Sequence, residues 1–82
     1  MFTVYVIHST SFNKIYVGFT SNLVQRLISH NELGKKGWTI KFRPWTLIYT
    51  EEFISKQEAI KREKELKTSA GRNFIRSLIN KA

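Results

Sequence analysis

The chain contains no cysteine, and its 82 residues include only one proline and four glycines. Without thiols it can form neither disulfide bonds nor thiolate metal sites, a composition compatible with a reducing cytoplasm. Acidic residues are also few, since six Asp and Glu oppose 14 Lys and Arg and leave a formal net charge of +8. A chain this basic favours polyanionic partners, with nucleic acid ahead of a membrane surface.

Long hydrophobic runs are absent as well. No apolar stretch is long enough to span a bilayer, and no basic amphipathic helix with a broad apolar face stands out. Residues 1–7 lack the basic region and the long apolar run of a signal peptide. We therefore expect a soluble cytoplasmic protein without a membrane partner, folded as one domain over residues 1–82 with room for one core and one site.

Two runs of β-branched and aromatic residues near the start of the chain predict a hairpin. They cover residues 4–7 and 15–17, and the polar stretch between them indicates a turn. If Tyr5 lies opposite Tyr16, both phenols project from the same face, whereas a shift of one residue separates them. The strand register therefore matters for any site that uses both tyrosines.

A helix is expected next, ending at about Asn31. Asn22 is an N-cap candidate, as are Thr20 and Ser21, and Gln25 follows it at capping-box spacing. Apolar residues at helical spacing form one face of this helix: Leu23, Val24, Leu27 and Ile28.

Beside that face, Asn22, Arg26 and His30 recur every four residues and form a polar row. Taken singly, Arg26 is an ordinary surface residue, and His30 is a cation favoured at a helix C-terminus. Tyr5 and Tyr16 are, on the same basis, strand tyrosines with packed rings and solvated hydroxyls. The shared row favours a functional interpretation, because it can reach a cleft beside the sheet.

Residues 32–44 lack a clear period and indicate a loop, in which alternating residues at 38, 40 and 42 allow a short extended piece. A third strand is expected from residue 45. The residues that alternate on one of its faces are Trp45, Leu47 and Tyr49.

Ser55 and Glu58 form a capping box, with Ile54 as the staple residue, and predict a helix over residues 56–67. A last helix is expected over residues 72–80, with an apolar side made of Phe74, Ile75, Leu78 and Ile79. The order ββαβαα predicts an α+β fold in which helices flank a small three-stranded antiparallel sheet.

Glu63 interrupts the apolar stripe of the 56–67 helix. The other members of the stripe are Ala59, Ile60, Leu66 and Ala70. An ionised carboxylate on a core-facing stripe is costly unless a cation or a hydrogen-bond donor meets it. A structural salt bridge to a nearby lysine or arginine is one explanation, and a metal ligand or general acid or base is the other.

Basic residues gather on two segments. The first is the loop, which contains Lys35, Lys36, Lys41 and Arg43 with Trp38 and Phe42 interleaved, and the second is C-terminal, with Lys67, Arg72, Arg76 and Lys81. The loop suits phosphate contacts and base stacking, although a solvated loop with a core tryptophan explains it equally well.

Taken together, these residues resemble the GIY-YIG nuclease superfamily, in particular its small stand-alone members related to the N-terminal nuclease module of excinuclease C. Thr3-Val4-Tyr5 stands at the first motif, with threonine in place of the glycine that names it, and Tyr16-Val17-Gly18 is a close form of the second. Further matches are residues 18–23, Arg26-Leu27, His30-Asn31, residues 34–39, Arg43-Pro44 and residues 59–63. The match covers nearly the whole chain, and Asn73 is the nearest candidate for a late family asparagine.

This resemblance implies a metal-dependent endonuclease that hydrolyses phosphodiester bonds in DNA, in repair or recombination. The implied catalytic residues are Tyr5, Tyr16, Arg26, His30 and Glu63. Glu63 would hold one Mg²⁺ or Mn²⁺ ion, Arg26 would hold the scissile phosphate, and Tyr5 with His30 would activate water while Tyr16 assists. The nucleic-acid-binding residues are expected to be Lys35, Lys36, Trp38, Lys41, Arg43, Arg72 and Arg76.

Two other functions stay open at this point. Thr3 in the first motif motivates a nucleic-acid-binding module of the same fold with little or no cleavage activity. A structural or protein-interaction domain is the third possibility, and it predicts no salt-dependent binding to DNA.

Overall fold

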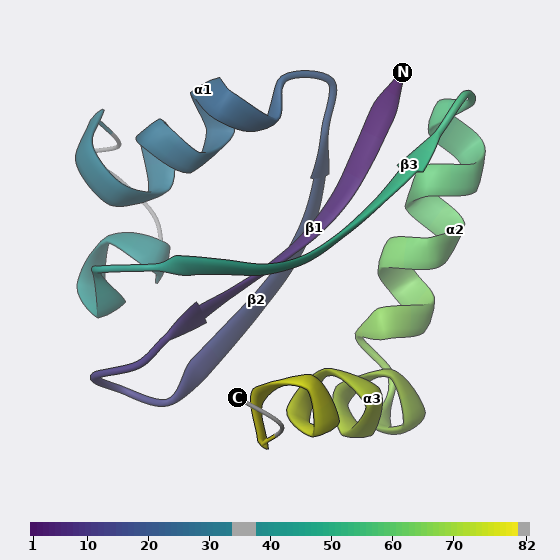
Figure 1. The fold of residues 1–82 in the computed structure, drawn as a ribbon. Helices are drawn as coiled ribbons and strands as arrows, with labels where there is room; N and C mark the ends of the chain where they lie inside the picture. The colour runs from purple at the N-terminus through teal and green to yellow at the C-terminus, as the bar shows by residue number, and fades with distance from the viewer. Residues whose placement is uncertain (34–37, 81–82) are drawn as a thin grey trace.

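The computed structural model describes residues 1–33 and 38–80 and has the expected α+β fold (Figure 1). Its elements, in chain order, are β1 (Phe2–Ser9), β2 (Lys14–Thr20), α1 (Leu23–Ile28), the π-helical turn η1 (Ser29–Leu33), the 3-10 helix η2 (Trp38–Phe42), β3 (Thr46–Phe53), α2 (Lys56–Leu66) and α3 (Ser69–Asn80). The three strands form one antiparallel sheet in the order β2-β1-β3. None of the helices in this part of the chain has the length and apolarity needed to cross a bilayer.

The hairpin register differs from the one considered above, because Tyr5 pairs with Gly18 and Tyr16 pairs with Ile7. Tyr5 and Tyr16 are thus diagonal neighbours and not a direct pair. Since side chains alternate with a period of two, an offset of two residues leaves both phenols on the same face of the sheet. Their ring centroids lie 6.3 Å apart.

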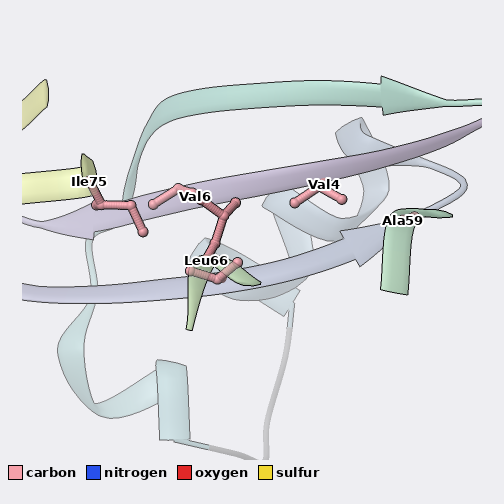
Figure 2. Packing of buried hydrophobic residues seen from close by; sticks show 6 residues of the cluster. Val4, Val6, Ala59, Leu66 and Ile75 are labelled. Carbon is pink, nitrogen blue, oxygen red and sulfur yellow. The ribbon is translucent and has the colours of Figure 1, made fainter. Parts of the chain in front are cut away.

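Both faces of the central strand β1 are buried. On one face, the alternating residues Val4 and Val6 join a cluster with residues of α2 and α3, namely Ala59, Leu66 and Ile75 (Figure 2). On the other face, Tyr5 and Ile7 pack with Trp45 beneath α1 and η2. Burial of one such aliphatic side chain is worth about 1.5–3 kcal/mol, so these two clusters carry the stability of the fold.

The expectations for residues 38–50 need two corrections. Residues 38–42 form the 3-10 helix η2 and not an extended piece, and the Trp45 indole N–H fixes this turn by donating to the Thr39 carbonyl at 2.7 Å. Trp45 itself precedes β3, and an irregularity opposite Val6 and Ile7 breaks the expected alternation. Leu47 is consequently exposed, whereas Ile48 packs against the cluster under α2 and α3.

The first helix begins as expected, because the Asn22 side chain accepts a hydrogen bond from the Gln25 backbone N–H at 3.2 Å. The α-helical part ends at Ile28, and the chain continues through η1 to Leu33. Val24 is exposed, which contradicts its assignment to the apolar face, so that Leu23 and Leu27 pack against the core while Val24 does not.

In α2 the N-cap is confirmed, since Ser55 Oγ accepts from the Glu58 N–H at 3.2 Å, and the Glu58 carboxylate accepts from the Ser55 hydroxyl at 3.0 Å in place of its backbone N–H. The staple is wrong, because Ile54 is 85% exposed. Ala70 is also exposed and belongs to α3, so the apolar stripe of α2 ends at Leu66. A stripe drawn from spacing alone does not detect the end of a helix.

The last helix starts at Ser69, three residues before the expected Arg72, because α2 and α3 meet at a tight corner. A Cβ atom at Gly71 would lie 2.4 Å from both the Glu65 carbonyl oxygen and the Leu66 Cα. A glycine at position 71 therefore permits this close approach, and Ile75 is buried one turn further along α3.

Replacing Gly71 with alanine should destabilise the protein by about 1–3 kcal/mol, because the added methyl overlaps the backbone at the end of α2. Urea denaturation of Gly71→Ala and of Asn73→Ala, an exposed position in the same helix, measures the effect. Equal midpoints for Gly71→Ala and the wild type would show that the corner is not tight.

Candidate active site

The Tyr5 hydroxyl is the centre of a buried polar cluster on the α1 side of the sheet. Tyr5 is fully buried in β1, and its hydroxyl lies 2.8 Å from His30 Nε2 and 3.4 Å from Arg26 Nε. The three residues come from β1, α1 and η1, which means that the cluster exists only when these elements pack together. Arg26 and His30 of the expected polar row reach the sheet, whereas Asn22 is exposed and caps α1.

Gly18 makes the space that this hydroxyl occupies. A Cβ atom at this position would lie 2.7 Å from the Tyr5 hydroxyl oxygen and 3.0 Å from Tyr16 Cε2. Gly18 lies within β2 and not at its end, so it serves the close approach of the two phenols and does not terminate the strand. Any larger residue would displace one or both phenols.

Tyr16 completes the ring cluster. Its ring centroid lies 5.0 Å from that of His30 and 6.3 Å from that of Tyr5. Tyr16 also affects Arg26, because its hydroxyl is among the groups that raise the pKa of that guanidinium, after the hydrogen bond to Tyr5. Of the five implied catalytic residues, four therefore lie in one cluster: Tyr5, Tyr16, Arg26 and His30.

The direction of the hydrogen bonds follows from what each group can donate. Arg26 has only donors, so the Tyr5 oxygen accepts from Nε and its own hydrogen is left for His30 Nε2. His30 Nε2 must then be unprotonated, which puts the imidazole hydrogen on Nδ1. Nδ1 lies 3.0 Å from Thr39 Oγ1, which accepts this hydrogen.

The pKa values agree with this arrangement. Burial raises the pKa of Tyr5 and outweighs the opposing hydrogen bond from Arg26. Burial also lowers the pKa of His30, and the nearby charges of Arg26 and Arg43 add to the effect. At neutral pH the cluster thus contains a neutral phenol, a neutral imidazole and a cationic guanidinium. The phenol can pass its hydrogen to His30 Nε2 along the hydrogen bond that joins them.

Glu63 lies in α2, which covers the face of the sheet opposite to this cluster. Its side chain is 17% exposed, and its Oε1 accepts a hydrogen bond from Lys67 Nζ at 3.1 Å. The expected salt bridge to a nearby lysine is therefore present. Burial is the main cause of the raised pKa of Tyr5, and the negative charge of Glu63 is the smallest of the causes that add to it. Lys67 and Tyr16 also line one cavity of about 240 Å³ at the edge strand β2.

A metal ion at Glu63 would depend on that one carboxylate. Within residues 1–33 and 38–80, no group of three or more His, Asp or Glu side chains is arranged to hold a metal. Mg²⁺ commonly takes one or two carboxylates together with waters and substrate phosphates, so a single hard oxygen ligand fits this chemistry. The Lys67 ion pair opposes binding only weakly, since pairs four residues apart on a helix are worth about 0.3–0.5 kcal/mol.

The expected nucleic-acid contacts have different surroundings. Lys35 and Lys36, together with the side chain of Trp38, lie outside the described residues. Exposed cationic side chains are found at Lys41 in η2 and at Arg72 and Arg76 in α3.

Arg43, the remaining expected nucleic-acid contact, forms hydrogen bonds within the protein. Its Nε donates to the His30 carbonyl at 2.6 Å, and its Nη2 donates to the Ser29 carbonyl at 3.1 Å. It thereby holds the η1 turn that carries His30.

Thr39 is a site residue that sequence reasoning missed. It is buried, its hydroxyl receives the His30 Nδ1 hydrogen, and its carbonyl receives the Trp45 indole hydrogen. Asn31 supports the same region, because its side chain exchanges two hydrogen bonds with the Trp45 backbone at 2.6 and 3.1 Å. Thr39 and Asn31 both fall within matched motif segments, but only the tertiary structure gives them partners.

Thr3 occupies regular extended backbone. It pairs with Thr20 on one side and with Glu52 on the other. Among the described non-glycine residues only Asn13 has a positive φ, so nothing in the backbone at position 3 calls for glycine. The altered first motif is compatible with an undistorted β1.

Comparisons with known proteins match most of the chain to one family. The family model of the GIY-YIG catalytic domain matches residues 1–75. A UPF0213 protein of Staphylococcus haemolyticus is 43% identical over 56 residues, which cover 68% of each chain. Those of Limosilactobacillus reuteri and Halobacterium salinarum are 35% and 37% identical, over 94% and 82% of this chain and 81% and 86% of theirs. No solved structure matches with statistical significance.

The buried neutral state of His30 predicts a specific pH dependence of stability. Its pKa is lower in the folded chain than the value of about 6.5 expected when unfolded, so between the two values the unfolded state binds more protons. The contribution of His30 is therefore fully present above about pH 6.5 and is lost as the pH falls. Between about pH 7 and 5, urea denaturation should show a steeper loss of stability in the wild type than in His30→Gln. Any contribution of His8 is common to both proteins and cancels in the difference between them. Equal losses of stability in the wild type and in His30→Gln would contradict a buried neutral His30.

The hydrogen bond from His30 to Thr39 can be tested by exchanging the threonine. Thr39→Val keeps the shape but removes the acceptor, so the Nδ1–H tautomer should lose its preference, whereas Thr39→Ser should retain it. Nitrogen chemical shifts of the His30 ring, measured by NMR, report the tautomer directly. An unchanged Nδ1–H signal in Thr39→Val would show that Thr39 does not set it.

Proposed function

Because the chain belongs to the GIY-YIG family, a nuclease superfamily whose members act on nucleic acid, we propose that it is an endonuclease that hydrolyses phosphodiester bonds in DNA. One observation carries this proposal. The Tyr5 hydroxyl is hydrogen-bonded to a neutral imidazole at 2.8 Å and lies beside a guanidinium at 3.4 Å. Such a group pairs proton transfer with an anion-binding cation, the two functions that phosphodiester hydrolysis needs.

Arg26 would bind the scissile phosphate. Arg26 is exposed. Its Nε is directed to Tyr5 and its side chain also hydrogen-bonds Tyr16, and the remaining donors of the guanidinium fork can reach a phosphate oxygen. A phosphate bound there would offset the positive charge that helps to lower the pKa of His30. Substrate binding would therefore make the imidazole a better proton acceptor.

Tyr5 and His30 would then activate the attacking water. Tyr5 is fully buried, so Arg26 would have to shift towards the bound phosphate to admit a water. The Tyr5 oxygen would then take a proton from that water while the phenol hydrogen passes to His30 Nε2, so that the phenol stays neutral and the imidazole becomes cationic. This concerted transfer avoids a free phenolate, which the raised pKa of Tyr5 disfavours. Tyr16, next to the same imidazole, would position the water or the phosphate.

Glu63 is the residue that would hold a divalent metal ion, Mg²⁺ or Mn²⁺, in this proposal. When bound, the ion would supply neutralisation of the charge that develops on the phosphate. For Glu63 Oε1 to bind the ion, Lys67 would have to give up its hydrogen bond to that oxygen. The weakness of such a surface pair makes this exchange inexpensive in free energy.

A second candidate function is a nucleic-acid-binding module with little or no cleavage activity. The Glu63–Lys67 ion pair favours it, because a carboxylate satisfied by lysine needs no metal. In that case the basic side chains of Lys41, Arg72 and Arg76 would bind the backbone while the tyrosine cluster served only the fold.

Nicking of supercoiled plasmid and of branched DNA with Mg²⁺ or Mn²⁺ tests the enzyme, and branched substrates are included because the proposal extends to repair or recombination. Glu63→Gln should lower the cleavage rate by about 100-fold or more. Glu65→Gln, at an exposed position on the same helix, should leave it unchanged.

Three results separate the alternatives. Equal product from wild type and Glu63→Gln would rule out Glu63 as the metal ligand. DNA binding that weakens with salt, without cleavage under any divalent metal, would favour the binding module. Absence of salt-dependent DNA binding would contradict both functions.

A further inference from the structure

An exposed aromatic and cationic surface lies at the tip of the β1–β2 hairpin. We call it the hairpin-tip surface, formed by Phe12, Lys14, Lys41 and Phe42. The Phe12 ring meets the Phe42 ring edge to face, with centroids 5.4 Å apart at 74°. The Lys14 ammonium lies 5.6 Å from the Phe42 centroid. In Figure 1 the teal turn of η2 lies beside this end of the hairpin.

Phe12 is not explained by the core. It is 51% exposed and does not belong to either buried cluster, whereas Phe42 packs against the cluster of Tyr5 and Trp45. The turn that carries Phe12 is well defined, since Asn13 adopts a left-handed conformation and its side chain lies 3.3 Å from His8 Nε2. The fold thus holds an aromatic side chain in place while leaving half of it in solvent.

The hairpin-tip surface is continuous with the candidate active site. Lys14 and Tyr16 are two residues apart in β2 and so project from the same face, roughly 6.8 Å from one another along the strand. Phe42 and Tyr16 pack against the same cluster, and the exposed Lys41 precedes Phe42 in η2. A polyanion held at Arg26 and Tyr16 would next meet Lys14 and then the two rings.

An exposed aromatic ring beside lysines suits one kind of partner, a nucleotide whose base is not stacked in a duplex. Base–aromatic stacking needs a free base face, and the neighbouring ammonium groups satisfy the phosphate. A continuous duplex offers the phosphates alone, because its bases are already stacked on one another. An apolar partner, by contrast, would leave Lys14 and Lys41 without a counter-charge.

We propose that the hairpin-tip surface binds an unpaired nucleotide adjacent to the scissile phosphate, with its base stacked on Phe12 and its phosphate held by Lys14 and Lys41. This inference rests on the proposed action on DNA, and it narrows the substrate class to DNA with a single-stranded segment next to the cleavage point. The exposed Arg72 and Arg76 of α3 would bind the remainder of the backbone.

Binding measured in EDTA tests the inference independently of cleavage. The probes are a blunt duplex and the same duplex with a short single-stranded tail that carries 2-aminopurine. The wild type should prefer the tailed probe and quench its fluorescence. Phe12→Leu, which keeps an apolar side chain against Phe42, should lose about tenfold in affinity for the tailed probe and hardly any for the blunt one.

Two further variants sharpen the result. Phe12→Trp should retain the preference because it retains an aromatic face, and Phe74→Leu, a control at an exposed phenylalanine on α3, should retain it as well. Equal affinities of the wild type for both probes would overturn the proposal. So would an equal loss for both probes in Phe12→Leu, or a dimer in sedimentation that Phe12→Leu abolishes.

The failures of the two proposals are distinguishable. Tail preference without cleavage under any metal would leave the hairpin-tip surface intact and overturn the nuclease. Cleavage of plasmid with equal binding of both probes would leave the nuclease intact and overturn the hairpin-tip surface.

Discussion

The hydroxyl of Tyr5 is the group around which this small structure is organised. It lies in the central strand, fully buried, and it can be satisfied there only by groups that α1 and η1 bring to it. An unpaired hydroxyl at this depth would cost about 1–3 kcal/mol, a large fraction of the stability of an 82-residue chain. Arg26 and His30 are therefore needed by the fold as well as by the chemistry proposed for them.

The arrangement around this hydroxyl extends outward in a defined order. Gly18 leaves the space, His30 accepts the hydrogen, and Thr39 fixes the tautomer through Nδ1. Arg43 holds the carbonyl of His30 and thereby the turn that carries it. Thr39 and Arg43 fix the position of His30, and His30 in turn fixes the Tyr5 hydroxyl. The geometry at Tyr5 therefore depends on residues that would contact no substrate.

Charge distinguishes the two sides of the sheet. On the α1 side, burial keeps Tyr5 and His30 neutral next to the cationic Arg26, and a bound anion would complete the charge balance. On the α2 side, Glu63 is already paired with Lys67, although its charge acts on Tyr5. The weakly held ion pair is thus the point at which a catalytic and a purely structural role of this chain differ.

The sequence by itself determined the order of elements, the capping of α1 and α2, and the residues that form the polar cluster, because periodicity, N-cap chemistry and motif spacing are local properties. The family resemblance named Tyr5, Tyr16, Arg26 and His30, and these four do come together. The exposure of Val24 and Ile54, the 3-10 helix at residues 38–42 and the early start of α3 could not be derived from spacing. Each of these features depends on which neighbour packs against the segment.

The tertiary structure alone decided the two-residue offset between Tyr5 and Tyr16, the acceptor role of Thr39 and the continuity of the hairpin-tip surface with the site. Strand register, hydrogen-bond partners and shared surfaces are relations between segments distant along the chain, and local pattern does not encode them.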